Sequence, residues 1–457
     1  MQLIFNVYSK KKIYTNLDRF NNSCLVKGRI NGSVVVPGDK SISHRALIIG
    51  LLSIGITKIK NILDSEDVFH TLKAIEALGA QVSVNNDIVK VLGVGIGNLK
   101  SPRKPIYMGN SGTGVRLLIG LVAGSNAIVT FYGDNSLSKR PMDRILEPLK
   151  KMGASFVYNK HKKLPITVIG ARKKSFTMPI SYKLPVASAQ VKSAILLAAL
   201  TARGITTVNE PNKSRDNTEV MLKNCGVKIH SNITKLGRNI VKINGVSCLE
   251  NCDIDVPGDP SSAVFIAVAV LISKNSKVNI KNVFNNKLRI EVFNILKKMG
   301  GNIKFIKKND TISDIQVESS KLKNINIKPN QATALIDEFP ILAIAAACGN
   351  GKMYMKNLGE LKHKESDRFM AIKNGLIKCG VEVNGNDEDL EIIGRKKIKG
   401  GCIINSNNDH RIAMAFNILN LVTDKPIKIL DNKSIITSFP NFFEVFKSLN
   451  LKIVINE

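Results

Sequence analysis

The sequence predicts an α/β protein of two domains, each built from three copies of one repeating unit. A helix–glycine–strand pattern recurs along the whole chain, and a second series of apolar helices recurs in phase with it. The segment VPGDK from Val36 is echoed by VPGDP from Val256, which marks an equivalent turn in the two halves. Chance similarity of helix ends is the alternative, but it does not explain two series in phase.

The first series is a helix that stops at a glycine or asparagine and continues as an alternating strand, as in EALGAQVSV from Glu76. Its turn residues are Gly79, Gly153, Gly226, Gly300, Gly380 and Asn450. They are roughly 70 to 80 residues apart, a period too long for a solenoid. Glycine and asparagine are favoured at a left-handed helix C-cap, so each turn should adopt that conformation.

The second series consists of apolar helices that follow small-residue or polar turns. They are expected to begin near Arg45, Val115, Val191, Ala263, Ile341 and Ile412. Six units in 457 residues suggest two domains of three units each. We expect residues 1–22 to be an N-terminal extension and residues 39–257 to form one domain. Residues 23–38 and 258–457 should form the other domain, because the first strand is expected to cross over and join the C-terminal half.

The net charge of +31 is extreme, and two explanations compete. One is a nucleic-acid or acidic-surface binder. The other is a compositional drift toward lysine in a protein with anionic substrates. The second is favoured, because lysines are scattered through every segment, aromatic residues make up only 5%, and no nucleic-acid-binding module is recognisable.

Arginine is rarer and more informative, since only 15 of the 67 basic residues are Arg. Where a chain uses lysine almost everywhere, an arginine often marks a need for bidentate geometry. Seven arginines fall inside the motifs described below: Arg45, Arg116, Arg140, Arg144, Arg215, Arg368 and Arg411.

The seven cysteines are dispersed, which is typical of thiols in a reducing compartment, and we expect a cytoplasmic protein. Cys248 and Cys252 form a single C-x3-C without a second pair, so no metal site is expected. The longest apolar run, Ala263–Ile272, is about half of a membrane span. Residues 1–22 are basic and lack a secretory core; they are a transit peptide or, as we favour, an N-terminal extension.

The stretch VPGDKSISHR, from Val36 to Arg45, places Lys40, Ser41 and Arg45 at a helix start, before an apolar helix over 46–52. Free backbone N–H groups, the helix dipole and these cations together favour an anion site. An ordinary capped helix with solvated basic residues is the alternative.

Five further segments carry polar residues at expected helix starts, and each has a plain structural alternative. GNSGTG, which contains Gly112, is a weak anion-loop signal. SKRPMDR with Arg140 and KHKESDR with Lys364, Glu365 and Arg368 resemble solvated charged segments. In LPVASAQVK, Ser188 is an N-cap candidate. In DEFP, Asp337 is either a cap or a general base.

Taken together, the motifs resemble the 5-enolpyruvylshikimate-3-phosphate synthase (3-phosphoshikimate 1-carboxyvinyltransferase) family of enolpyruvyl transferases. The matching segments, in the family's order, are VPGDKSISHRAL, GNSGTGVR, SKRPMDR, LPVASAQVKSA, DEFPILA, KHKESDR and NDHRIAM. The resemblance runs from about Cys24 to the C-terminus. It implies two domains, each of three βαβαββ units around a pseudo-threefold axis (an inverse α/β barrel), with the active site in the cleft between them.

The resemblance implies transfer of the enolpyruvyl group of phosphoenolpyruvate to the 5-hydroxyl of shikimate 3-phosphate, a step of aromatic amino-acid and chorismate biosynthesis. The implied shikimate 3-phosphate contacts are Lys40, Ser41, Arg45, Ser188, Gln190, Arg215, Asp337 and Lys364. The implied phosphoenolpyruvate contacts are Lys40, Gly112, Arg140, Gln190, Arg368 and Arg411. Glu365 is the implied acid and Asp337 the implied base, with Lys40 assisting. No cofactor, metal, nucleic acid or membrane is implied, and the protein is expected to be a monomer.

Three positions depart from the family pattern. Ala189 stands where a second serine is common, Glu360 stands near a usual asparagine, and Thr437 replaces a usual lysine, with Lys433 four residues earlier. Gly112 is typical of glyphosate-sensitive members, whereas Ala189 often accompanies tolerance.

Three rival functions are weighed against this one. The related transferase that acts on UDP-N-acetylglucosamine usually has a catalytic Cys in its first domain, but no Cys lies between Cys24 and Cys225 here. A nucleic-acid-binding protein is suggested by charge alone. The intact set of motif residues argues against an inactive scaffold.

Overall fold

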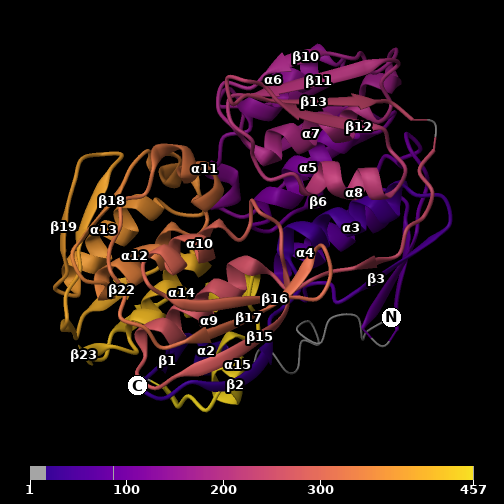
Figure 1. Ribbon diagram of the computed structural model, residues 1–457. Helices are drawn as coiled ribbons and strands as arrows, with labels where there is room; N and C mark the ends of the chain where they lie inside the picture. The colour runs from indigo at the N-terminus through magenta and orange to yellow at the C-terminus, as the bar shows by residue number, and fades with distance from the viewer. Residues whose placement is uncertain (1–16, 86, 247, 456–457) are drawn as a thin grey trace. The chain divides into compact units, whose positions relative to one another are not determined.

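A computed structural model describes residues 17–85, 87–246 and 248–455, which divide into two compact units. Unit 1 is Lys40–Val256, and unit 2 combines residues 17–39 with residues from Pro257 onward (Figure 1). No helix in the described part of the chain is long and apolar enough to cross a membrane.

Unit 1 contains three four-stranded sheets that share one strand order. The middle repeat has β6 (Ile106–Tyr107), α5 (Gly112–Ala123), β7 (Ile128–Tyr132), α6 (Asp143–Lys151), β8 (Ser155–Tyr158) and β9 (Ile166–Ile169). Strand β6 pairs in parallel with β7, and β9 pairs antiparallel with both β7 and β8. This is the βαβαββ repeat that the family resemblance implies.

The other two repeats of unit 1 follow the same scheme. One has β10 (Ser181–Lys183), α7 (Ala189–Ala199), β11 (Ile205–Glu210), α8 (Asn217–Asn224), β12 (Ile229–Ile233) and β13 (Asn239–Asn244). The other has α3 (Lys40–Leu52), β3 (Ile56–Lys60), α4 (Glu66–Ala77), β4 (Gln81–Asn85), β5 (Ile88–Leu92) and, paired in parallel with β3, β14 (Ile254–Asp255).

Unit 2 repeats the scheme with more variation. Its first repeat has β2 (Asn31–Val35), α9 (Pro260–Ile272), β15 (Lys277–Phe284), α10 (Glu291–Lys298), β16 (Asn302–Lys307) and β17 (Ile312–Glu318). The second has α12 (Phe339–Cys348), β18 (Lys352–Met355), α13 (Arg368–Lys378), β19 (Glu382–Asn384) and β20 (Leu390–Ile393).

The last repeat of unit 2 is split into three two-stranded sheets. It has β21 (Ile398–Gly400), β22 (Ile403–Asn405), α14 (His410–Leu419), β23 (Thr423–Lys425), β24 (Lys428–Leu430), α15 (Phe442–Ser448) and β25 (Ile453–Ile455). Strand β1 (Ser23–Leu25) pairs antiparallel with β25, so the N-terminal segment completes this repeat.

Shorter helices connect the repeats. They are α2 (Leu17–Asn22), α11 (Ala332–Leu335) and the 3₁₀ helices η1 (Leu137–Lys139), η2 (Ala171–Lys173), η3 (Pro329–Gln331), η4 (Gly359–His363) and η5 (Asn432–Thr437). In α2, the Phe20 ring lies 4.9 Å from that of Phe443. Residues 17–22 of the expected N-terminal extension thus form a helix that contacts α15 through Phe20, whereas residues 1–16 lie outside the described residues.

All six turns of the first sequence series have positive φ. The values run from 69° at Asn450 to 115° at Gly79. The predicted left-handed C-caps are thus confirmed, and each is followed by a strand.

The second series forms the interior of each unit. Most residues of α3, α5 and α7 in unit 1 are buried, as is almost every residue of α9, α12 and α14 in unit 2. The predicted helix starts were too late. Helix α3 begins at Lys40 rather than near residue 45, and α5 begins at Gly112 rather than at Val115. Apolar periodicity misses these first turns, since most of their residues are polar or small, as with Lys40 and Ser41 in α3 and Gly112 in α5.

The echo of VPGDK and VPGDP has a direct structural meaning in unit 2. The amide of Asp39 donates to the carbonyl of Pro257 at 2.8 Å, and the amide of Asp259 donates to that of Pro37 at 2.9 Å. Arg289 contacts both carboxylates, at 2.6 Å to Asp39 and 2.8 Å to Asp259. The two equivalent turns are therefore paired reciprocally and bridged by one buried arginine.

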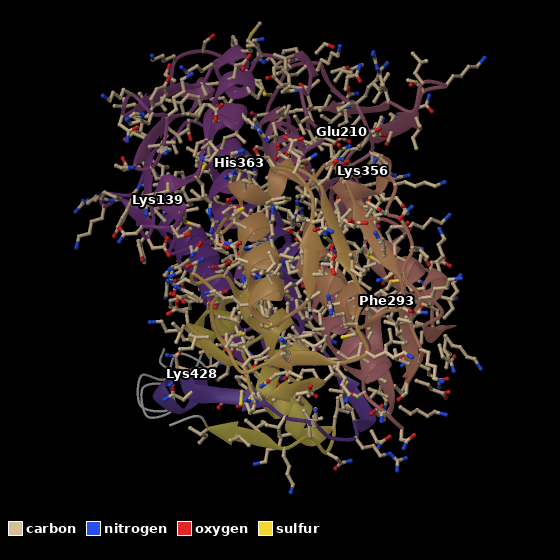
Figure 2. All side chains as sticks on the ribbon, turned by 90° about the vertical axis from the view of Figure 1, so that its left-hand side faces the viewer. Lys139, Glu210, Phe293, Lys356, His363 and Lys428 are labelled. Carbon is tan, nitrogen blue, oxygen red and sulfur yellow. A yellow bond between two sulfur atoms is a disulfide. The ribbon has the colours of Figure 1, made fainter. Side chains whose placement is uncertain are left out.

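The cysteines differ from the expectation of dispersed thiols. Cys225 and Cys252 are joined in a disulfide, with Cα atoms 6.0 Å apart. That separation is ordinary for a disulfide, although 27 positions separate the two residues in sequence. The lysines, in contrast, fit the prediction of a scattered solvated charge, as at Lys139, Lys356 and Lys428 (Figure 2).

Candidate active site

In unit 1, Lys40 opens α3 and forms an ion pair with a residue of α4. Its Nζ lies 2.5 Å from Oδ2 of Asp67, and the two side chains are 17% and 7% exposed. Sequence reasoning missed Asp67, which stands in an acidic helix start that resembles ordinary dipole compensation. The pair holds the lysine head group at the beginning of α3.

Arg45 is buried and donates to protein groups. Its Nε atom donates to Thr218 at 2.6 Å, Nη2 donates to Ser193 at 2.9 Å, and Nη1 donates to the carbonyl of Ser41 at 2.9 Å. These bonds tie α3 to α7 and α8. The structure therefore gives Arg45 a role in holding three helices, and its contact with a substrate stays a prediction.

Gly112 lies at the first position of α5, beside Arg140. A Cβ atom on Gly112 would come within 2.6 Å of Nη1 of Arg140 and 3.0 Å of Nη1 of Arg116. Arg140 is 7% exposed and donates to Oδ1 of Asn110. Its segment is thus no solvated turn: the guanidinium is packed against the start of α5.

The start of α7 combines a cap with a cross-helix bond. The hydroxyl of Ser188 accepts from the amide of Val191 at 3.4 Å, which confirms the N-cap interpretation. Gln190 donates to Thr113 of α5 at 3.0 Å. The starts of α5 and α7 therefore adjoin. Arg215 is half-buried and lies two residues before α8.

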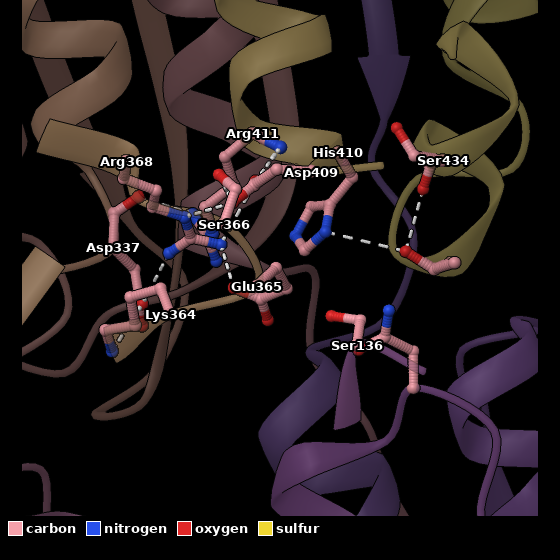
Figure 3. A network of polar contacts seen from close by, with 12 residues as sticks. Ser136, Asp337, Lys364, Glu365, Ser366, Arg368, Asp409, His410, Arg411 and Ser434 are labelled. Carbon is pink, nitrogen blue, oxygen red and sulfur yellow. Dashed lines mark hydrogen bonds and ion pairs between the residues drawn. The ribbon is translucent and has the colours of Figure 1, made fainter. Parts of the chain in front are cut away.

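In unit 2, Arg368 is the centre of a carboxylate cluster (Figure 3). Its side chain is 1% exposed and contacts Asp409 at 2.7 Å, Asp337 at 3.4 Å and Glu365. Burial opposes the guanidinium charge, but the carboxylates of Asp409, Glu365 and Asp337 outweigh it and raise the pKa of Arg368. The arginine therefore stays charged and orients three acidic side chains.

Two further cations complete the cluster. Nζ of Lys364 lies 3.3 Å from Oδ1 of Asp337, and Nη1 of Arg411 donates to the backbone carbonyl of Asp337 at 2.8 Å. Arg411 also lies 3.8 Å from Glu338. The Asp337 side chain is 20% exposed and that of Glu365 is 22% exposed, so both carboxylates can reach a ligand.

The cluster corrects two structural alternatives from the sequence. The segment KHKESDR is not simply a solvated face, because Arg368 is buried. The N-cap position of α12 is Glu338, and Asp337, one residue earlier, pairs with Lys364 and Arg368. Asp409 was missed: it both pairs with Arg368 and caps α14 by accepting from the Arg411 amide at 2.9 Å.

Thr437, which replaces a lysine usual in the family, contacts Ser434 and lies near His410. Its hydroxyl donates to the carbonyl of Ser434 at 2.8 Å and lies 3.5 Å from Nδ1 of His410. Glu360 lies in η4, ahead of the KES segment.

Each unit thus presents cations at the starts of its interior helices, and unit 2 adds two accessible carboxylates. Such a set suits multiply anionic substrates, because arginines bind phosphate and carboxylate bidentately and helix starts favour negative charge. Asp337 and Glu365, each beside a cation, are carboxylates of the type that can take up or give a proton.

Comparison with known proteins agrees with this chemistry. The sequence model of the family EPSP synthase (3-phosphoshikimate 1-carboxyvinyltransferase) matches residues 26–446. The chain belongs to the EPSP synthase family. It is 44% identical over 433 residues to the 3-phosphoshikimate 1-carboxyvinyltransferase of Parvibaculum lavamentivorans, an alignment that covers 93% of this chain and 95% of that protein.

A second relative, the 3-phosphoshikimate 1-carboxyvinyltransferase of Petrotoga mobilis, is 46% identical over 427 residues, which cover 92% of this chain and 97% of that protein. Among solved structures, an EPSP synthase of Acinetobacter baumannii superimposes with a TM-score of 0.81 at 37% identity, covering 94% of this chain and 99% of that chain. The predicted family and fold class are confirmed.

Proposed function

We propose that this chain transfers the enolpyruvyl group of phosphoenolpyruvate to the 5-hydroxyl of shikimate 3-phosphate, releasing inorganic phosphate, as in the shikimate pathway. The observation that carries the proposal is the unit 2 cluster, in which Asp337, Lys364, Glu365, Arg368 and Arg411 are joined by ion pairs and hydrogen bonds. Family membership supports the same reaction.

The substrate assignments are proposals that rest on residue chemistry and on the family pattern. For shikimate 3-phosphate we propose Lys40, Ser41, Arg45, Ser188, Gln190, Arg215, Asp337 and Lys364. For phosphoenolpyruvate we propose Lys40, Gly112, Arg140, Gln190, Arg368 and Arg411. Both substrates are anions that repel each other, so cations must surround them.

The reaction needs proton transfer in both of its steps, addition and elimination. In the addition step, a proton reaches the methylene carbon of phosphoenolpyruvate and the 5-hydroxyl loses one as its oxygen bonds to the adjacent carbon. Elimination from the tetrahedral intermediate then removes a methyl proton and expels phosphate. We assign Glu365 as the acid and Asp337 as the base, with Lys40 assisting; in so coupled a site, the groups can share these roles.

Arg368 supports this assignment of roles. It contacts both Glu365 and Asp337, so it stabilises their ionised forms when a proton has left. Lys364 adds a second positive charge beside Asp337. The Asp337 carboxylate, held between these two cations, can accept the hydroxyl proton once the substrate hydroxyl lies within hydrogen-bonding reach.

We also propose that residues 39–257 and residues 23–38 with 258–457 are two domains acting on one substrate pair. This rests on the family pattern, as do a monomeric state and a cytoplasmic location. A nucleic-acid-binding function has only the net charge in its favour.

A phosphate-release assay tests the reaction. Shikimate 3-phosphate and phosphoenolpyruvate together should release phosphate, whereas omission of either should abolish it. Replacing shikimate 3-phosphate with UDP-N-acetylglucosamine should give none. Release that requires the sugar nucleotide would reassign the chain to the related transferase, and release from phosphoenolpyruvate alone would contradict group transfer.

A further inference from the structure

Two cysteine pairs occupy equivalent positions in the repeat. Cys225 and Cys379 each end a helix, α8 and α13 respectively, and each directly precedes a positive-φ glycine, Gly226 or Gly380. The two residues therefore have the same backbone setting, one in unit 1 and the other in unit 2.

Their partners are equivalent as well. Cys252 lies seven residues before Asp259, the N-cap of α9, and Cys402 lies seven residues before Asp409, the N-cap of α14. Each pair thus connects a helix end with the segment that leads into the next interior helix.

The two pairs differ in bonding. Cys225 and Cys252 are joined in a disulfide, whereas the Sγ atoms of Cys379 and Cys402 lie 3.5 Å apart as thiols. Cys379 is fully buried, and Cys402 is partly exposed. The second pair is therefore adjacent, accessible from one side, and not bonded.

We propose that Cys379 and Cys402 form a reversible oxidation site, which becomes a second disulfide by exchange with a low-molecular-weight disulfide. The repeat equivalence to Cys225 and Cys252 carries the proposal, because the same backbone arrangement already accommodates a disulfide in unit 1. The proposal is independent of the catalysed reaction.

Cys402 should react first, because it is partly exposed whereas Cys379 is fully buried. Its thiolate attacks one sulfur of the external disulfide R–S–S–R, which forms a mixed disulfide and releases one RSH. The Cys379 thiolate then attacks the Cys402 sulfur and releases the second RSH. Two protein thiols are oxidised to one disulfide, and R–S–S–R is reduced to two RSH.

The second step should be slow and should depend on pH. Burial, with the adjacent Cys402, raises the pKa of Cys379, so little thiolate is present near neutrality. Its thiolate fraction rises about tenfold per pH unit below that pKa. Formation of the Cys379–Cys402 disulfide from the mixed disulfide should therefore accelerate by the same factor.

The link would connect the C-cap of α13 with the segment between β21 and β22, which precedes α14. Cys379 ends α13, whose first residue is Arg368, and Cys402 leads into α14, which carries Arg411. Oxidation would therefore tether the segments that hold both arginines.

The test uses the full-length chain, first reduced with dithiothreitol and then equilibrated with glutathione disulfide. After alkylation and proteolysis, mass spectrometry should find a Cys379–Cys402 cross-linked peptide alongside Cys225–Cys252. Reduction leaves all seven cysteines as thiols, and the two disulfides together should consume four of them. Reduced glutathione should reverse the change.

Two outcomes would overturn the proposal. Both apply under conditions that oxidise Cys225–Cys252 completely. The first is that Cys379 and Cys402 are both recovered as thiols. The second is that Cys402 carries a persistent glutathione adduct while Cys379 is recovered as a thiol. The control is Cys402→Ser, in which Cys379 should remain a thiol because no reachable partner starts the exchange. Glutathione on Cys379 in that variant would contradict the order of attack.

Discussion

The Nε atom of Arg368 lies 2.7 Å from Oδ2 of Asp409, and the exposed fractions of the two side chains are 1% and 0%. A buried ion pair of this kind is costly to break from one side, since the remaining charge is left without compensation. Asp409 also caps α14, so one carboxylate supports both the arginine and the helix that carries Arg411.

Asp409→Asn should destabilise the protein by about 3 kcal/mol, the lower end of the range for breaking a buried pair. Asparagine still caps a helix, so the loss reports mainly the missing charge. Urea unfolding of both proteins measures the difference. Asp310→Asn is the matched control, since Asp310 pairs with Lys307 in solvent and should change nothing measurable. Equal stability of the wild type and Asp409→Asn would show that Arg368 does not depend on this partner.

Gly112→Ala should weaken both phosphoenolpyruvate binding and glyphosate inhibition. The added methyl would lie 2.6 Å from Nη1 of Arg140, so the guanidinium must move. Overpacking costs about 1–3 kcal/mol, which corresponds to roughly 5- to 150-fold weaker binding. Steady-state inhibition, which we expect to be competitive with phosphoenolpyruvate, measures both constants.

Gly28→Ala is the control for that experiment, because its added methyl would meet Leu451 at an ordinary 3.4 Å. It should leave the KM for phosphoenolpyruvate and the glyphosate inhibition unchanged. An inhibition curve that is the same for Gly112→Ala and wild type would rule out the steric explanation.

His44 should make the protein less stable in mild acid. Burial, reinforced by the charges of Lys40 and Arg45, lowers the pKa of His44 well below its usual 6.5. Below about pH 6.5 the unfolded chain binds a proton that the folded chain does not. The free energy of unfolding should therefore fall with pH below that value, by up to about 1.4 kcal/mol per unit, and level off above it.

Urea unfolding between pH 5 and 8 tests this dependence. His44→Gln should flatten the slope near pH 6, whereas His230→Gln, at an exposed strand position, should leave the slope as in wild type. An unchanged slope in His44→Gln would assign the acid sensitivity to other groups.

The sequence was sufficient for the architecture wherever a local conformation has a local cause. Positive φ at Gly79 or Asn450 is a property that these residue types favour, so the six turns could be predicted one by one. The first residue of α3 was less well defined, because Lys40 is polar and obtains its partner, Asp67, from another helix.

The same distinction explains the candidate site. The motif residues could be named from the family pattern, but their partners could not, since Asp67 is brought to Lys40 by the packing of α4 on α3. Arg45 shows the reverse: its type and position suggested an anion ligand, and the fold surrounds it with Thr218 and Ser193. Nothing in the spacing of Cys225 and Cys252 predicted their disulfide, because the intervening strands form a hairpin only in the folded sheet.

The roles of Glu365 and Lys40 are separable by their effects on binding and turnover. If Glu365 protonates the methylene carbon, Glu365→Gln keeps the side-chain shape and an oxygen that can accept from Arg368, but it has no proton to transfer. A positioned acid contributes about a hundred- to ten-thousand-fold, or roughly 3–5 kcal/mol of barrier. Turnover should fall by that factor while the Kd for shikimate 3-phosphate changes little.

Lys40→Met should behave differently, because it removes a charge that we assign to both substrates and leaves Asp67 buried without its partner. Binding and turnover should therefore fall together, with some loss of stability. Glu382→Gln and Lys58→Met are matched controls at exposed ion pairs, and both should retain wild-type binding and turnover. Calorimetric Kd values and initial rates for the four variants separate the roles. Near-normal turnover in Glu365→Gln would remove Glu365 from the mechanism, and unchanged binding in Lys40→Met would confine that lysine to its pair with Asp67.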